Sequence, residues 1–215
     1  YIRKYGAVPT LNVPDQDAWT WCTRPASRAR IRICGENRAS VSHNVVAELT
    51  GDAPDADCIY LCAHVDTQAD TVGADDNAIG CAILLELARV LAARPHRSTI
   101  RLIAFGAEEV LSLGSAEYVR RHRHELAQHA AFVCNFDSCG SAVGWNQLIT
   151  SLDDALSQCV RSCFERAGCY YVELDTPDPC NDLFPFTALG VAGITVMRRN
   201  CEAGVFYHHR PDNTL

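Results

Sequence analysis

Four short apolar runs, separated by longer segments of helical periodicity, constrain the fold of this chain most. The runs are rich in Ile, Val and Leu and do not alternate strictly with polar residues, which is typical of strands buried on both faces of a parallel sheet. They cover residues 58–63, 100–105, 131–136 and 191–197. Strands that alternate with helices in this way predict an α/β fold with a central, mostly parallel sheet.

The segments around these runs complete the predicted architecture. We expect helices over residues 77–93, 115–128, 152–167 and 182–189. The first of them is apolar on most sides and is followed by Pro95, so we expect it to end there and to lie in the interior. Residues 30–34 and 42–49 are predicted to form a flanking hairpin, and residues 1–29 a peripheral N-terminal segment.

Charge and hydropathy narrow the range of partners. The chain has 215 residues and a formal net charge of −7, which favours neither a nucleic acid nor an anionic membrane as partner. No apolar run reaches the roughly 18 residues that a membrane span requires. The basic run at 120–124 follows Glu117 at helical spacing and is therefore predicted to be a solvated helix face. Small molecules or peptides remain as the expected ligands.

The cysteines leave the cellular compartment open. No two of the twelve cysteines form a C-x-x-C pair, which argues against a zinc ribbon or a thioredoxin-type redox motif. Several lie in apolar stretches, where free cysteine behaves as a small buried hydrophobic residue, so we expect mostly reduced thiols. The chain begins with Tyr1 and shows no signal peptide, which predicts a processed or excised piece of a secreted or cytoplasmic protein.

Residues with acid–base or metal-binding side chains stand where the predicted strands end. Imidazole and carboxylate groups follow the first three apolar runs, at His64, Asp66, Glu108, Glu109 and Asp137. The Gly-Ala-Asp-Asp-Asn turn at 73–77 and the Tyr-His-His sequence at 207–209 add further groups. Because ligands of open α/β sheets bind beyond the carboxyl ends of the strands, these side chains mark the predicted site.

Each of these groups alone has an ordinary structural explanation. A single histidine is usually a satisfied surface or core residue, an Asp-Asp-Asn sequence before a helix usually caps that helix, and a pair of glutamates is usually solvated. Their combination is harder to explain, because carboxylates at the mouth of a buried sheet are costly unless a cation or protonation compensates. The combination therefore predicts a metal site.

The number and type of the groups suit zinc. Five nitrogen and oxygen ligands come from His64, Asp76, Asp137, one residue of the Glu108–Glu109 pair and one residue of the His208–His209 pair. With one bridging carboxylate and a shared water, they make two four-coordinate sites, as in two-metal hydrolysis. The other glutamate is left for proton transfer, and Asp66 can accept the second ring N–H of His64.

The same residues form a series of motifs that resembles the di-zinc aminopeptidases of metallopeptidase family twenty-eight. The motifs are Ala-His-Val-Asp at 63–66, Gly-Ala-Asp-Asp-Asn-Ala-Ile-Gly at 73–80, Phe-Gly-Ala-Glu-Glu at 105–109 with Leu-Gly-Ser at 113–115, Asn-Phe-Asp at 135–137, and His-Arg-Pro-Asp-Asn-Thr-Leu at 209–215. Their order and spacing match from about residue 42 to the last residue. The Asn-Asp-Leu-Phe-Pro-Phe sequence at 181–186 also resembles the family's Ser-Asp-His-x-Pro-Phe, with Asn and Leu replacing Ser and His.

The resemblance implies a fold and a domain organisation. The fold is an α/β three-layer sandwich in which helices flank a central, mostly parallel sheet. Residues 30–215 would form the zinc peptidase catalytic domain, without the closing helix into which family members continue.

The resemblance also implies a role for each residue of the site. His64 and Asp137 would bind one zinc ion, Glu109 and His209 the other, and Asp76 would bridge the two. Asp76 would be joined to the next residue by a cis peptide bond. Glu108 would be the general base. Some family members place a tyrosine immediately before the last ligand, where this chain has His208.

The activity that these roles imply is removal of N-terminal residues from peptides by a zinc aminopeptidase. Glu108 would take a proton from a water activated by two zinc ions and pass it to the departing amine. The alternatives are a carboxypeptidase, dipeptidase or glutaminyl cyclase on the same scaffold, or a non-catalytic receptor domain. The presence of all five ligands and the base argues against the last of these. The oligomeric state is not predicted.

Overall fold

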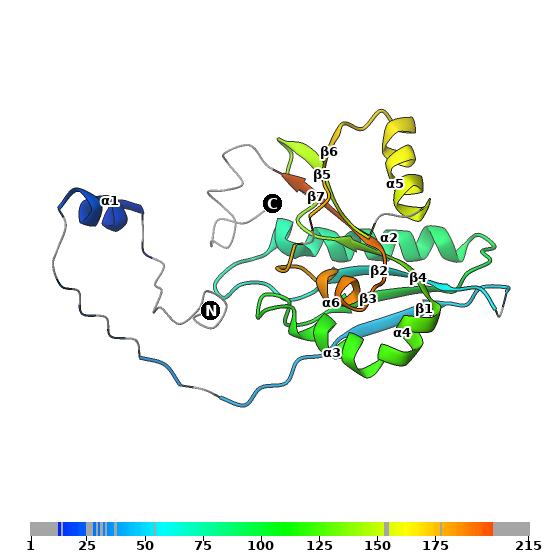
Figure 1. The fold of residues 1–215 in the computed structure, drawn as a ribbon, viewed down its shortest axis with the longest axis horizontal. Coiled ribbons are helices and arrows are strands. Elements are labelled where there is room, and N and C mark those ends of the chain that lie inside the picture. Colours follow the sequence, from blue (N-terminus) through cyan, green and yellow to red (C-terminus); the bar gives the residue numbers. More distant parts are fainter. Residues whose placement is uncertain are drawn as a thin grey trace. The chain divides into compact units, whose positions relative to one another are not determined.

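A seven-stranded mixed sheet is the central feature of the computed structural model, which describes residues 13, 15–24, 28, 30, 32, 34–36, 38–53, 55–152, 155–176 and 178–199 (Figure 1). The strands are β1 (Val45–Leu49), β2 (Cys58–His64), β3 (Ile100–Phe105), β4 (Ala130–Phe136), β5 (Trp145–Ser151), β6 (Tyr171–Leu174) and β7 (Gly193–Arg199). Their order in the sheet is β1-β3-β2-β4-β7-β5-β6. The four central strands β3, β2, β4 and β7 are parallel, whereas β1 and β5 pair antiparallel with β3 and β7. The mostly parallel sheet is thus confirmed.

Helices cover both faces of this sheet. The helices after the first strand are α2 (Ile79–Ala92), α3 (Leu113–Arg121), α4 (Arg123–His129), α5 (Ala155–Arg166) and α6 (Phe184–Ala188), and the short turn η1 (Ala74–Ala78) precedes α2. Helices α3, α4 and α6 lie on one face, and α2 and α5 lie on the other (Figure 1). The α/β three-layer sandwich is the observed fold.

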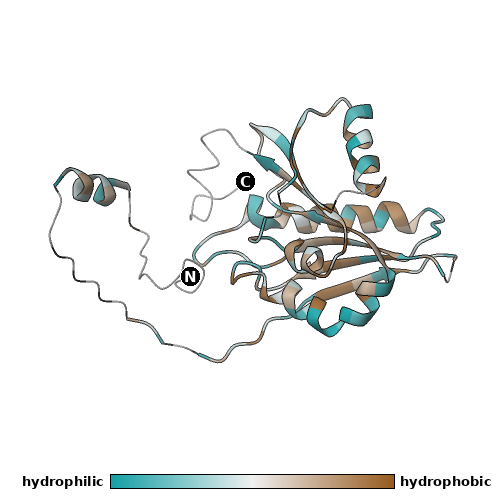
Figure 2. Cartoon of the chain, in the orientation of Figure 1, coloured by the Kyte–Doolittle hydropathy of each residue, from teal (hydrophilic) through white to brown (hydrophobic). Residues whose placement is uncertain are grey.

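The alternation of side chains along the central strands produces two cores. On β2, Tyr60 and Cys62 pack with Phe186 of α6 on one face, whereas Leu61 and Ala63 pack in clusters on the face of α2 and α5. Period-two alternation places successive side chains on opposite faces, so apolar residues at every position are needed here. Figure 2 shows the resulting concentration of hydrophobic residues in the central strands.

Two expectations about the sheet and its interior helix are wrong. Arg30, Arg32 and Cys34, the described residues of the predicted strand at 30–34, belong to no strand, and β1 pairs with β3 instead of forming a hairpin with them. Helix α2 is not enclosed, because Leu85 on its outer side is 74% exposed. Leu84 and Ala88 on its inner side pack on the sheet. Apolar residues on most sides of this helix therefore did not imply that all of its sides are buried.

The predicted helix at 115–128 is interrupted, and two strands were not foreseen. The backbone leaves the helical region at His122, where the ring stacks on Tyr118 with 4.3 Å between ring centroids. Strands β5 and β6 extend the sheet beyond β7. The sequence of β5 does not look like a buried strand because its buried residues Gln147 and Thr150 are polar. Gln147 accepts a hydrogen bond from Arg199, and Thr150 donates one to Glu173.

The chain divides into two compact units, residues 1–40 and 41–215. The first contains the helix α1 (Asp15–Thr23). This division follows Ser40, whereas the sequence pattern placed the start of the main domain at residue 30; the catalytic domain at 30–215 stays a prediction.

The described part of the chain also bears on the cysteines, the basic run and the membrane. Among the described residues, three free thiols are buried, at Cys58, Cys62 and Cys134, and five are exposed, at Cys22, Cys34, Cys159, Cys163 and Cys169. Arg120 and Arg121 both pair with Glu117, at 2.6 and 2.7 Å, as expected for a solvated helix face. Among the described helices, none is both long enough and apolar enough to cross a bilayer.

Candidate metal centre

The carboxyl ends of β2, β3 and β4 bring the predicted site residues to one edge of the sheet. His64 is the last residue of β2, and Asp137 directly follows β4. Glu108 and Glu109 come shortly after β3, which lies beside β2. Asp76 lies in η1, at the entry to the helix that follows β2. The structure thus places these residues beyond the carboxyl ends of the parallel strands, where the sequence pattern predicted them.

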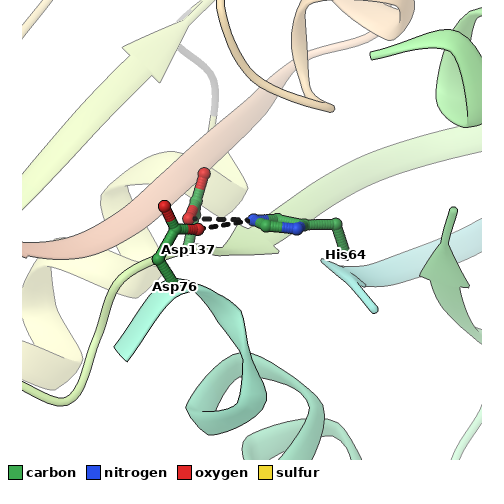
Figure 3. Close-up of side chains that lie close together, drawn as sticks. All are labelled: His64, Asp76 and Asp137. Atoms are coloured by element: carbon green, nitrogen blue, oxygen red, sulfur yellow. Dashed lines mark ion pairs between the residues drawn. The ribbon is translucent and has the colours of Figure 1, made fainter. Parts of the chain in front are cut away.

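Three of the five predicted ligands meet with their polar atoms facing one another (Figure 3). Nε2 of His64 lies 3.0 Å from Oδ1 of Asp76 and 3.4 Å from Oδ1 of Asp137. His64 is 1% exposed and Asp76 is 5% exposed. Nε2 forms no well-aligned hydrogen bond with either carboxylate. One nitrogen and two oxygens thus point to a common centre, and this donor set fits a zinc ion.

The turn that carries Asp76 is fixed by its neighbours. The peptide bond between Asp76 and Asn77 is cis, as expected. The buried amide of Asn77 donates to the main-chain oxygen of Phe136 at 2.8 Å and accepts from the N–H of Gly80 at 3.1 Å. Gly73 begins the turn with φ 65°, and a Cβ there would clash with Cγ2 of Thr67. The turn is therefore tied both to α2 and to the end of β4.

Asp66 connects His64 with the glutamate pair. Its two carboxylate oxygens accept hydrogen bonds from the N–H groups of Glu108 and Glu109, at 3.0 and 3.2 Å. Nδ1 of His64 lies 2.9 Å from the main-chain oxygen of Asp66 and 3.7 Å from its carboxylate. The main-chain oxygen, rather than the expected carboxylate, is therefore the closer partner of Nδ1. This partner leaves Nε2 to face the two aspartates.

Glu108 is buried among other acids. Its Oε1 accepts a hydrogen bond from the hydroxyl of Ser112 at 3.2 Å. Burial is the main cause that raises the pKa of Glu108 to about 8, and the charge of Asp182 adds to it. Asp182 is 1% exposed, and burial raises its pKa to about 7. Perturbed carboxyl groups of this kind are characteristic of sites that bind cations or move protons.

The other two predicted ligands, Glu109 and His209, are not seen to join this group. The carboxylate of Glu109 accepts a hydrogen bond from the side-chain amide of Gln68 at 2.7 Å and is not part of the group that His64, Asp76 and Asp137 form. His209 and the neighbouring His208 lie outside the described residues. Ser112, Gln68 and the buried acid Asp182 were not predicted as part of the site. Only the last had a signal, since it lies in the Asn-Asp-Leu-Phe-Pro-Phe sequence.

Burial lowers the pKa of His64, but the carboxylates of Asp137, Asp66 and Asp76 outweigh it and raise this pKa well above its usual value. These carboxylates therefore favour the protonated imidazole in the metal-free protein. A metal ion at Nε2 must displace that proton, so binding weakens as the pH falls.

These pKa shifts predict how the stability of the metal-free protein depends on pH. A carboxyl group with a raised pKa holds its proton in the folded state after the unfolded chain has lost it, so the free energy of unfolding falls as pH rises. For Glu108 this window runs from its usual pKa of 4.5 to about 8. The loss is up to about 1.4 kcal/mol per pH unit for each such group. Urea unfolding of chelator-treated protein between these pH values measures it.

The variant Glu108→Gln provides the control for this measurement. The amide cannot ionise, so the slope should be smaller than in the unchanged protein. A free energy of unfolding that rises with pH across the window, or an equal slope in the variant, would contradict these pKa directions.

Comparison with known proteins places the chain in a family. Residues 44–215 match the sequence model of peptidase family M28. The aminopeptidase YwaD of Bacillus subtilis is 30% identical over 168 residues, which cover 74% of this chain and 36% of that protein. A probable zinc metalloprotease of Pyricularia oryzae is 37% identical over 110 residues, which cover 47% of this chain and 22% of that protein.

Solved structures give the same result. A zinc aminopeptidase from Bacillus subtilis superposes with a TM-score of 0.73 at 26% identity, covering 80% of this chain and 44% of that one. The aminopeptidase from Aneurinibacillus sp. strain AM-1 gives a TM-score of 0.71 at 27% identity, covering 80% and 42%. The chain thus shares its α/β fold with solved aminopeptidase structures. This chain belongs to peptidase family M28. It spans less than half the length of each of these relatives.

Proposed function

We propose that this chain is the catalytic part of a zinc-dependent aminopeptidase that removes N-terminal residues from peptides. The observation that carries the proposal is the convergence of Nε2 of His64 with carboxylate oxygens of Asp76 and Asp137 at the edge of the sheet. Membership of a peptidase family and relatives named as aminopeptidases support the choice of reaction.

Two zinc ions are proposed for the site. His64 and Asp137 would hold one, Glu109 and His209 the other, and Asp76 would bridge them. The first three residues supply a donor set that suits zinc, and Glu109 would bind through a carboxylate that also accepts a hydrogen bond from Gln68. Bound zinc supplies a water of lowered pKa and polarises the scissile carbonyl group.

Glu108 is proposed to move the proton. Its buried carboxylate, next to Ser112, would accept a proton from the attacking water and return it to the departing amine. The environment that raises the pKa of Glu108 to about 8 in the metal-free protein makes it a strong proton acceptor once it is ionised. Asp66 would orient both His64 and the backbone of the glutamates through its hydrogen bonds.

Removal and return of metal test this proposal. Treatment of the full chain with a chelator should abolish hydrolysis of an aminoacyl substrate, and zinc or cobalt should restore it. Parallel assays with a C-terminally free, N-blocked peptide and with an N-terminal glutamine peptide distinguish the related activities. Full activity of the metal-free protein would exclude the metal mechanism, and turnover of the N-blocked peptide alone would exclude an aminopeptidase.

A further inference from the structure

The segment that follows Asp137 is held against the turn that carries Asp76. One oxygen of the Asp75 carboxylate accepts a hydrogen bond from the N–H of Gly140 at 2.6 Å. Its other oxygen accepts from the hydroxyl of Ser141 at 3.1 Å. Asp75 thus links two segments that are 65 residues apart in the sequence. Each of its oxygens has a partner on the same short stretch of chain.

The close approach at this link depends on a glycine. A Cβ at Gly140 would lie 3.1 Å from Oδ1 of Asp75 and 3.3 Å from Cγ1 of Ile79. A side chain there would therefore require the Asp75 carboxylate or Ile79 to shift by a few tenths of an ångström. The fit between the segment and the turn is tight at the point where the Asp75 carboxylate meets the backbone.

The same segment is held from its other side by Arg198 of β7. The guanidinium donates from Nε to the main-chain oxygen of Ser141 at 2.5 Å and from Nη2 to that of Gly144 at 3.2 Å. The N–H of Arg198 also donates to the main-chain oxygen of Ser138 at 2.9 Å. Ser141 is therefore bound through its hydroxyl by Asp75 and through its carbonyl by Arg198.

The two facing aspartates lie between two such links. On one side, Asn77 bonds with the main-chain oxygen of Phe136. On the other side, Asp75 bonds with Gly140 and Ser141. Asp76 lies between Asp75 and Asn77 in the sequence, and Asp137 lies between the partners of those two residues. The two sets of hydrogen bonds therefore restrict how far the carboxylates of Asp76 and Asp137 can move apart.

We propose that Asp75 is a positioning residue for the metal site, which sets Asp137 opposite Asp76 by bonding the segment that follows Asp137. It is not a ligand itself, since both of its oxygens are directed to Gly140 and Ser141. Residues that orient ligands in this way change metal affinity by about 10- to 100-fold when they are replaced. The inference rests on the proposed zinc site, and it concerns how that site is held before the metal arrives.

The test is the zinc affinity of the full chain, measured by competition with a chromogenic chelator. Asp75→Ala should bind zinc about 10- to 100-fold more weakly than the unchanged protein. Asp75→Asn should bind close to normally, because its amide oxygen can accept from Gly140 and its amide nitrogen can donate to Ser141. Asp52→Ala, which removes an exposed carboxylate in the turn between β1 and β2, is the matched control and should bind normally.

The urea midpoint of each metal-free variant separates positioning from general stability. If Asp75→Ala lowers the midpoint but leaves zinc affinity unchanged, Asp75 is merely structural and the inference is wrong. If Asp75→Asn is as weak as Asp75→Ala, the charge or direct ligation matters and the inference is also wrong. If Asp75→Ala does not fold, Ser141→Ala and Gly140→Ala replace it, and normal zinc affinity in both would overturn the inference.

Failure of the proposed function gives a different result. An unchanged protein that binds no zinc would reject the metal site itself and, with it, any role for Asp75. An unchanged protein that binds zinc, together with an Asp75→Ala variant that binds equally well, would reject only the positioning role.

Discussion

Replacement of Glu108 by glutamine is expected to lower the turnover rate for an aminoacyl substrate by about two to four orders of magnitude, the usual contribution of a general base. The amide keeps the shape of the side chain and its contact with Ser112, but it cannot accept the proton of the attacking water. Zinc content and substrate affinity should change little, because the proposed role of Glu108 begins after binding. Steady-state kinetics together with metal analysis of the same preparation measures both quantities.

Glu109→Gln is the matched control for this experiment, since it makes the same chemical change one residue further along. It should reduce zinc content, because Glu109 is the proposed ligand. A loss of zinc in the Glu108 variant with full zinc in the Glu109 variant would mean that the two roles are exchanged. Unchanged turnover in both variants would reject the hydrolase mechanism.

Replacement of Asp76 by alanine is expected to remove both zinc ions and to reduce activity to background. A bridging carboxylate would contribute to both metal sites at once. Its loss would leave each zinc ion with only two protein ligands, whereas zinc sites usually have at least three. Atomic emission analysis after gel filtration measures the bound metal. Urea unfolding of the metal-free variant, compared with the metal-free unchanged protein, separates loss of metal from loss of the fold.

Asp137→Ala provides the comparison for the bridging role. It should lower the zinc content from two ions to about one, since the site of Glu109 and His209 would keep its ligands. Equal zinc content in the Asp76 and Asp137 variants would contradict the assignment of Asp76 as the bridge.

The central strands could be predicted because burial on both faces requires apolar residues at nearly every position. Strands β2, β3, β4 and β7 meet this requirement, and each was located to within about two residues. Strand β5 does not, since its polar residues are satisfied by partners from other strands that the local sequence cannot identify. The exposed outer side of α2 was missed for a related reason, because composition indicates what a helix can bury and not what covers it.

The site was predictable where it depends on the ends of parallel strands. His64, Asp137 and the glutamate pair follow such strands, so topology alone brings them to one edge. The hydrogen bonds that orient them were not predictable, because they join residues distant in sequence. Gln68 on Glu109 and the main-chain oxygen of Asp66 on His64 follow no spacing rule.

The central claim is that His64, Asp76 and Asp137 form a metal centre. A crystal structure of the zinc-loaded full chain, with diffraction data collected on both sides of the zinc absorption edge, tests this claim most directly. The account predicts an anomalous peak within bonding distance of Nε2 of His64 and of carboxylate oxygens of Asp76 and Asp137, with a second peak on the other side of Asp76. Zinc bound elsewhere, with no anomalous peak among these three side chains, would contradict it.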